Sequence, residues 1–228
     1  MKNIAIKLLI GLSVLLNVTV AYIAIGMANG QLPAVLLKLM VEPNYQRWVS
    51  QFDAVPVQPG DVVFLGDSIT EGGSWHELFP TISVRNRGIG GDTTSGVLAR
   101  LHQVADGEPS KVFLLIGTND LATGESDEAI IDNISRIVDR LVTESPETQV
   151  FVQSILPRGG SFRERIEMLN DELRSSVEDR AQWVDLYSLM LDDDGSISDH
   201  YSNDELHLYV EAYKLWADAI ADYLTAEE

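Results

Sequence analysis

Residues 61–70 read Asp-Val-Val-Phe-Leu-Gly-Asp-Ser-Ile-Thr, and this stretch decides the fold. The apolar run at 62–65 predicts a buried strand that leads directly into Gly66, Asp67 and Ser68. In an open α/β sheet, ligands bind at the carboxyl ends of the strands, so Ser68 is expected at a ligand-binding edge. A serine there is a candidate nucleophile, provided that the chain supplies a base and a group that orients the base.

Strands and helices alternate through the rest of the chain. Further apolar runs predict strands at 82–84, 112–116, 150–155 and 183–186. Helical patterns occupy residues 94–104, 127–142, 162–177 and 210–224. Helices between successive strands imply right-handed crossovers. The predicted fold class is therefore α/β, with a mainly parallel five-stranded sheet and helices on both of its faces, in one domain.

Composition limits the possible chemistry and partners. The chain has 228 residues, no cysteine and a formal net charge of −19. Without cysteine, the chain can form no disulfide, thiolate metal site or thiol nucleophile. Two of the 16 basic side chains, Lys2 and Lys7, lie in the first 30 residues, which hold no acidic side chain. The remainder is strongly acidic and would repel nucleic acid, so we expect no nucleic-acid partner.

The amino terminus is long and apolar. Residues 8–27 carry no charge, and 20 such residues can cross a hydrocarbon core of roughly 30 Å as a helix. We interpret residues 1–30 as a transmembrane anchor, with a secretory signal cleaved near Ala28 as the alternative. Lys2 and Lys7 precede the span, which predicts a cytoplasmic amino terminus. The following domain would then be anchored on the periplasmic or extracellular side, or be secreted after cleavage.

Residues 31–59 form a predicted connector, which is broken up by Pro33, Pro43, Pro56 and Pro59. One face of a short helix between Pro43 and Pro56 would carry Tyr45, Trp48, Val49 and Phe52. We expect this face to pack against the edge of the domain that residues 60–228 form.

Two other predicted strands also end in residues suited to catalysis. Gly88-Ile89-Gly90-Gly91-Asp92 follows the second strand, and Gly117-Thr118-Asn119-Asp120 follows the third. Asp204 and His207 come between the fifth strand and the last helix, and their spacing places them on one side of a turn. We expect these segments at the same edge of the sheet as Ser68.

Together these residues could perform acyl transfer. His207 would take the proton of Ser68, while Asp204 would accept from Nδ1 of the imidazole and leave Nε2 facing outward. Attack on a carbonyl creates an oxyanion, which needs donors aimed at it. The backbone N–H groups of Ser68 and Gly91 suit this role, and Asn119 offers a side-chain amide.

Each motif also has a purely structural or a different catalytic interpretation. Ser68 alone could cap a helix. The glycines at 88–91 lack the lysine of a P-loop, and Thr93 stands where G-x-G-x-x-G requires its last glycine. Thr70 likewise occupies the position of the second glycine in the G-x-S-x-G elbow.

The remaining polar residues predict no metal site. The glycine of Asp192-Asp193-Asp194-Gly195 comes too early for an EF-hand, and the sequence gives no clustered partners to His76, His102 and His200. Asp67, Asp92 and Asp120 are expected to cap or support neighbouring segments. Trp75 and His76 either border the pocket or pack elsewhere, and Arg158 either touches substrate or lies on the surface.

Four segments, in order, resemble the motifs of the GDSL/SGNH hydrolase superfamily. They are Gly66-Asp67-Ser68-Ile69-Thr70 (with Ile-Thr in place of the leucine), Gly90-Gly91-Asp92-Thr93, Gly117-Thr118-Asn119-Asp120 and Asp204-x-x-His207. Within it, bacterial acylhydrolases and acetylhydrolases of platelet-activating-factor type look most similar. The resemblance implies a three-layer αβα flavodoxin-like sandwich and hydrolysis of esters or thioesters without a metal or organic cofactor. It also implies that Ser68, Asp204 and His207 are catalytic and that Gly91 and Asn119 bind the oxyanion.

Three functional hypotheses remain open at this stage. The favoured one is a serine esterase or acylhydrolase that forms an acyl-enzyme on Ser68 and acts on small-molecule, lipid or glycan esters. A carbohydrate O-deacetylase of the same fold is the alternative among enzymes. A catalytically inactive, membrane-tethered binding module is the alternative of another class. The sequence leaves the oligomeric state undetermined.

Overall fold

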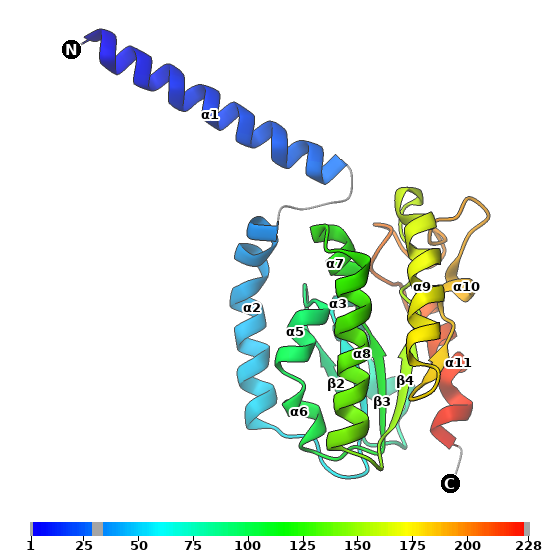
Figure 1. Cartoon of the computed structure of the whole chain (residues 1–228). Coiled ribbons are helices and arrows are strands. Elements are labelled where there is room, and N and C mark those ends of the chain that lie inside the picture. The colour runs from blue at the N-terminus through cyan, green and yellow to red at the C-terminus, as the bar shows by residue number, and fades with distance from the viewer. Residues whose placement is uncertain (1, 29–33, 226–228) are drawn as a thin grey trace.

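A parallel sheet covered by helices on both faces forms the body of the protein (Figure 1). The computed structural model describes residues 2–28 and 34–225. Within these residues the sheet has five strands: β1 Val62–Gly66, β2 Val84–Gly88, β3 Lys111–Leu115, β4 Gln149–Gln153 and β5 Gln182–Val184. Their order is β2-β1-β3-β4-β5, and all four pairings are parallel. This is the flavodoxin-like order, and the predicted three-layer fold is confirmed.

The helices form the two outer layers. One face of the sheet is covered by α5 Thr94–Ala99, α6 His102–Ala105, α8 Asp127–Glu144 and α9 Arg163–Val177. The opposite face is covered by α4 Trp75–Leu78 and α11 Val210–Thr225. Shorter helices α3 Ser68–Glu71, α7 Thr118–Thr123 and α10 Tyr187–Met190, with a 3₁₀ turn at Gly160–Phe162, lie between them in the chain.

Alternation along the central strands divides the core between the two faces. Val63 and Leu65 of β1 pack under α8, whereas Val62 and Phe64 face α4 and α11. The Phe64 ring stacks on Trp75 at 3.9 Å and on Phe113 at 5.3 Å. Strands buried on both faces read as continuous apolar runs, which is why 62–65 and 112–116 were recognisable from sequence.

Several predicted elements differ from those observed by one or two residues at their ends, and two elements of the domain differ by more. The second strand runs from Val84 to Gly88, whereas the sequence predicted 82–84. Among the described residues this edge strand pairs with β1 alone. It carries the polar residues Arg85 and Asn86, so it shows no continuous apolar run in the sequence. The predicted helix at 94–104 is two helices, α5 and α6, because the chain turns at Arg100, whose side chain is buried.

The connector helix is longer than predicted. Helix α2 spans Ala34–Ala54 and passes through Pro43, so Pro43 does not mark its beginning. A proline inside a helix removes one backbone hydrogen bond but need not end the helix. Phe52 of α2 is buried in the domain, and the Arg87 guanidinium lies 4.6 Å from its ring centroid. The expected packing of this segment on the domain is therefore observed.

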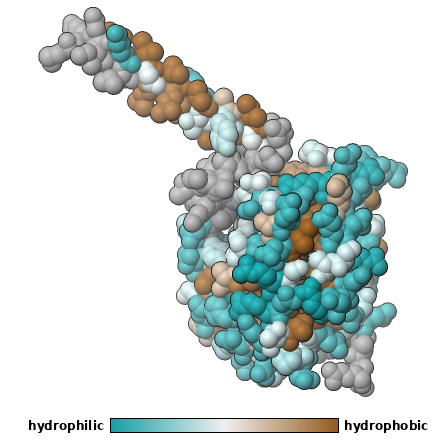
Figure 2. Space-filling view, in the orientation of Figure 1, coloured by the Kyte–Doolittle hydropathy of each residue, from teal (hydrophilic) through white to brown (hydrophobic). Residues whose placement is uncertain are grey.

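Helix α1, Lys2–Ala28, is apolar and solvent-exposed (Figures 1 and 2). Its segment Leu9–Gly26 has a mean hydropathy of 2.1, and none of it is buried. By length and composition this is the one helix among the described residues that could cross a membrane. The boundary expected between residues 30 and 31 falls within 29–33, outside the described residues, so the division into 1–30, 31–59 and 60–228 stays a prediction.

Candidate active site

The topology brings three loops to one edge of the sheet. Strand β1 lies between β2 and β3, with Gly66 paired in register to Gly88 on one side and to Leu115 on the other. The segments that leave these three strands carry Ser68, Gly91 and Asn119. Strand order thus brings the loops that carry the glycine and the asparagine to the edge where β1 leads into the serine.

Ser68 is the first residue of α3, and its hydroxyl does not cap the helix. The N-cap is Asp67, whose Oδ1 accepts a hydrogen bond from the Ile69 N–H at 3.0 Å. Because Asp67 performs the capping, the Ser68 hydroxyl is available to other partners. The capping interpretation of Ser68 is wrong for this reason.

Asp204 and His207 reach Ser68 from the loop that precedes α11. His207 Nε2 lies 3.2 Å from Ser68 Oγ, and His207 Nδ1 lies 2.7 Å from Asp204 Oδ2. The other oxygen of Asp204 accepts from the backbone N–H groups of Leu206 and His207, at 3.1 and 2.7 Å. Glu205 makes this tight turn possible with a left-handed φ of 58°. These bonds orient the imidazole toward the serine, as the three-residue spacing predicted.

Gly91 lies in a turn that leaves its N–H free. The Asp92 N–H donates to the Ile89 carbonyl at 3.0 Å, and Gly91 has a φ of +77°. In the four-residue turn from Ile89 to Asp92, Gly91 is the third residue, and a positive φ there is typical of a type II turn. The Gly91 N–H belongs to the central peptide of this turn. Among the described residues the Gly91 N–H donates no hydrogen bond to the backbone.

Asn119 is held against this turn. Its Nδ2 donates to the Asp92 carbonyl at 2.8 Å, and the side chain is buried. An amide nitrogen has two hydrogens, so one donor remains after this bond. The turn and the asparagine therefore form a single unit beside Ser68.

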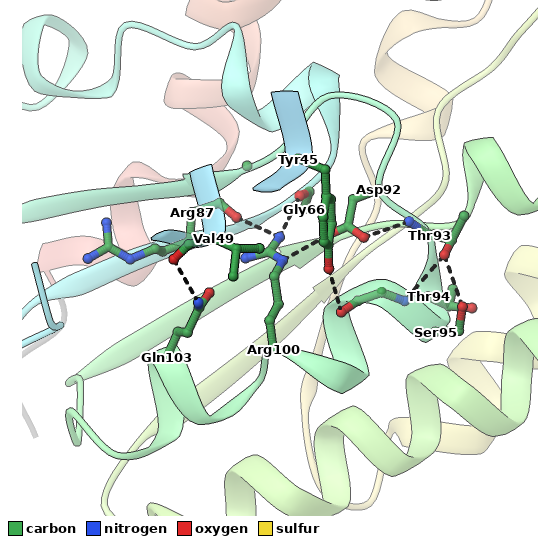
Figure 3. Close-up of polar contacts among 12 residues, drawn as sticks. Tyr45, Val49, Gly66, Arg87, Asp92, Thr93, Thr94, Ser95, Arg100 and Gln103 are labelled. Atoms are coloured by element: carbon green, nitrogen blue, oxygen red, sulfur yellow. Dashed lines mark hydrogen bonds and ion pairs between the residues drawn. The ribbon is translucent and has the colours of Figure 1, made fainter. Parts of the chain in front are cut away.

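Two buried carboxylates support the loops after β2 and β3. Asp92 pairs with Arg100, with 2.8 Å between Oδ2 and Nε (Figure 3). Asp120 accepts from both the N–H and the hydroxyl of Thr94, at 3.0 and 2.6 Å. The expected supporting role of these acids is observed in each of these contacts.

Burial shifts the acids of this edge in different directions. Burial, reinforced by the charges of Asp92 and Asp120, raises the pKa of Asp67 to about 7. Burial also raises the pKa of Asp120 to about 6. Burial opposes ionisation of Asp204 as well, but hydrogen bonds from His207 prevail and lower its pKa below the ordinary value. Asp204 is therefore the acid of this group best suited to carry a charge beside the imidazole.

The other candidate residues have simpler environments. Trp75 belongs to the core, which excludes it from the site, and His76 is exposed. Arg158 is half-buried: Nη1 donates to the Thr118 carbonyl at 3.1 Å, and the guanidinium lies 4.5 Å from the Phe162 centroid. Burial lowers the pKa of Arg158. Among the described residues, no group of three or more metal-ligating side chains converges.

The matches to known proteins agree with this site. Residues 64–215 match the model of the GDSL-like Lipase/Acylhydrolase family, and the chain belongs to that family. It is 33% identical to "Platelet-activating factor acetylhydrolase IB subunit alpha2" of Gallus gallus over 183 residues, covering 73% of this chain and 79% of the relative. Family membership makes the protein a hydrolase of ester bonds.

Solved structures share the fold. A GDSL-like lipase from Bacteroides thetaiotaomicron superposes with a TM-score of 0.69 at 25% identity, covering 79% of this chain and 97% of that one. A family 3 carbohydrate esterase from Clostridium thermocellum has a TM-score of 0.58 at 23% identity, covering 73% of this chain and 98% of that one. The second similarity extends to the fold alone.

Two residues of this edge had no signal in the sequence. Arg100 lies in an unremarkable helical pattern, yet its guanidinium is buried between the loops. Glu71 follows the serine motif closely, yet nothing in its spacing indicated that it contacts both α2 and the turn at 89–92. Both residues contact segments that are distant in sequence, and the hydrophobic periodicity of the sequence gives no information on such contacts.

Asp67→Asn should change how stability depends on pH. The raised pKa means that folded protein holds a proton between about pH 4 and 7 that unfolded protein has released. This carboxyl therefore lowers the free energy of unfolding as pH rises through that window, by on the order of 4 kcal/mol at most. The asparagine side chain of the variant can keep the cap without that loss. Urea unfolding at several pH values should show that the free energy of unfolding of the variant increases relative to that of the parent as pH rises to about 7.

The exposed Asp218 of α11 provides the control. Asp218→Asn should leave the pH dependence of the parent unchanged. If the free energies of unfolding of Asp67→Asn and the parent differ by the same amount at every pH from 4 to 8, Asp67 is not protonated in the folded protein.

Proposed function

We propose that the protein is a serine esterase that forms an acyl-enzyme on Ser68. The observation that carries this proposal is the continuous line of contacts from Ser68 Oγ to His207 and from His207 to Asp204, at 3.2 and 2.7 Å. Serine needs a base within such reach, and the base needs an orienting group. All three residues come from segments that the fold brings together.

The first half-reaction releases the alcohol. Ser68 Oγ attacks the acyl carbon while His207 Nε2 takes its proton, and the carbonyl oxygen becomes the oxyanion. The N–H groups of Ser68 and Gly91 and the amide of Asn119 donate to that oxygen. His207 then protonates the leaving alkoxide as the bond to the acyl carbon breaks.

The second half-reaction frees the acid. Water attacks the acyl carbon as His207 accepts one of its protons, and Ser68 recovers a proton as the acyl group departs. Asp204 remains ionised throughout, in agreement with its lowered pKa, and stabilises the imidazolium in both halves.

Ser68→Ala should abolish hydrolysis of p-nitrophenyl acetate, with a loss of about 10³-fold or more, because it removes the proposed nucleophile. Asn119→Ala should lower kcat by about 10²- to 10³-fold and leave KM nearly unchanged, since its donor acts in the transition state. Initial rates over a range of substrate concentrations measure both effects.

Ser175→Ala, at an exposed serine of α9, is the matched control and should retain the parent rate. A fluorophosphonate probe should label the parent protein and fail to label Ser68→Ala. Full turnover by Ser68→Ala would refute the proposed nucleophile. Absence of labelling and turnover in the folded parent would favour the inactive binding module.

An apolar groove beside the site favours esters with an apolar portion. The groove has a volume of about 470 Å³ and begins next to His207, at Leu208. Its lining residues are Gly72, Ser74, Glu77, Leu78, Leu208, Val210, Tyr213 and Lys214. Leu78, Leu208, Val210 and Tyr213 give it an apolar stretch that suits an acyl or alkyl chain, while Ser74, Glu77 and Lys214 supply its polar groups. We therefore propose lipid-like esters over acetylated carbohydrates.

Val210→Asp should test the groove without disturbing the fold. Val210 is exposed at the first turn of α11, where a carboxylate is favourable for the helix. The charge should lower kcat/KM for long-chain p-nitrophenyl esters by about tenfold and leave acetate hydrolysis unchanged. The control is Val142→Asp, on α8 outside the groove. Equal losses on short and long esters, or a preference of the parent for acetylated xylose, would argue against an apolar substrate.

We also propose that α1 anchors the protein in a membrane, with the catalytic domain on the outer side. The uncharged length of Leu9–Gly26 and the preceding lysines Lys2 and Lys7 support this orientation. An anchored esterase would act on substrates near that surface.

Cell fractionation should recover the protein in the membrane pellet, released by detergent but not by high salt. Amino-terminal sequencing of this material should begin at Met1, and added protease should digest the domain in cells whose inner membrane is intact. A soluble product that begins near Ala28 would instead establish a cleaved signal.

A further inference from the structure

Glu71, the last residue of α3, connects two segments that are distant in the chain. Its Oε1 accepts a hydrogen bond from Trp48 Nε1 of α2 at 2.6 Å, and its Oε2 accepts from the Gly90 N–H at 2.5 Å. Each carboxylate oxygen therefore has one donor, from a different element. Through this side chain, α2 is joined to the turn that carries Gly91.

The turn at 89–92 needs such support. In a type II turn the central peptide, here between Gly90 and Gly91, can rotate to the type I arrangement with little movement of its neighbours. The turn lies beside Ser68, since a Cβ added to Gly90 would lie 3.9 Å from Ser68 Cβ. The rotation would reverse the direction of the Gly91 N–H, and the proposed oxyanion would lose this donor. The bond from Gly90 to Glu71 fixes the start of the turn, and the bond from Asp92 to Ile89 fixes its end.

The packing around Glu71 leaves little freedom. A Cβ added to Gly90 would lie 2.9 Å from Glu71 Oε2, and one added to Gly88 would lie 2.2 Å from the Glu71 backbone nitrogen. The loop after β2 therefore approaches α3 as closely as glycine allows. A shift of Glu71 would be transmitted directly to this loop.

Helix α2 is itself held firmly to the domain (Figure 3). The Tyr45 hydroxyl donates to the Gly96 carbonyl at 3.4 Å, and Gln103 donates to the Val49 carbonyl at 3.2 Å. The Trp48 ring lies 5.4 Å from the buried Phe52 ring. Trp48 is therefore a fixed donor and can hold Glu71 in place.

We propose that Trp48 and Glu71 are positioning residues that keep the Gly91 N–H aimed at the oxyanion. The inference rests on the proposed function and extends the active site to α2, which would otherwise be a simple connector. It holds for either fate of α1, because cleavage near Ala28 would leave α2 attached.

A double-mutant cycle in the full-length, detergent-solubilised chain tests this inference. Glu71→Gln replaces two acceptors by one acceptor and one donor, so it cannot satisfy both Trp48 and Gly90. Trp48→Phe removes the indole donor and keeps an aromatic ring against Phe52. In the double variant the single acceptor of the new glutamine side chain is free to serve Gly90 alone. The effects of the two changes should therefore not multiply.

Kinetics with p-nitrophenyl acetate supply the readout. Each single variant should lower kcat about tenfold with KM within about twofold, because misplaced groups affect the transition state most. The kcat of the double variant should be about tenfold, and not a hundredfold, below that of the parent. Gln46→Ala, on an exposed part of α2, should retain the parent kcat. Urea midpoints confirm that every variant is folded.

The inference would be overturned if the single variants had the kcat of the parent. It would also be overturned if the two losses of kcat multiplied to about a hundredfold in the double variant. An equal rise of KM in every variant would also contradict it, since that indicates a change in substrate binding. Ser68→Ala separates this failure from that of the proposed function. If Ser68→Ala is inactive and the Trp48 and Glu71 variants are fully active, only the positioning role is refuted.

Discussion

The buried guanidinium of Arg100 is the interaction on which the catalytic edge depends. It pairs with Asp92 at 2.8 Å and donates to the carbonyls of Gly66 and Arg87, at 3.1 and 2.9 Å. Those carbonyls lie at the ends of β1 and β2, so one side chain ties both strands to the turn after β2. A buried charge that loses its partner costs about 3–5 kcal/mol, so this arrangement has little freedom to change.

Other buried charged groups hold the remaining segments at this edge of the sheet. Asp67 caps the helix that begins with Ser68, and Asp120 holds Thr94 at the start of α5. These acids bind backbone and hydroxyl groups of the protein itself, so they hold the segments around Ser68 in place. Under the proposed mechanism, a site preorganised in this way would not have to reorganise as charge develops on the oxyanion. The cost is a set of buried carboxyls with raised pKa values, which the fold must tolerate.

Much of the fold could be predicted from the sequence, and the exceptions have physical causes. The strands at 62–65 and 112–116 and the helix at 127–142 were recognisable because their apolar residues follow the period of the element. The edge strand β2 and the continuation of α2 through Pro43 depend on contacts made elsewhere in the fold. The candidate site residues Ser68, Gly91, Asn119, Asp204 and His207 were predictable from motifs, whereas Arg100, Glu71 and Trp48 carry no motif.

The sequence by itself determined the fold class and singled out the candidate site residues, because periodicity and short motifs are local properties of the chain. Only the tertiary structure decided how those side chains are held. Strand order brought the loops that carry Gly91 and Asn119 together beside Ser68, and the contacts of Arg100 and Glu71 hold the turn that carries Gly91. Such contacts join residues that are far apart in sequence. Their geometry arises from packing, which no local pattern encodes.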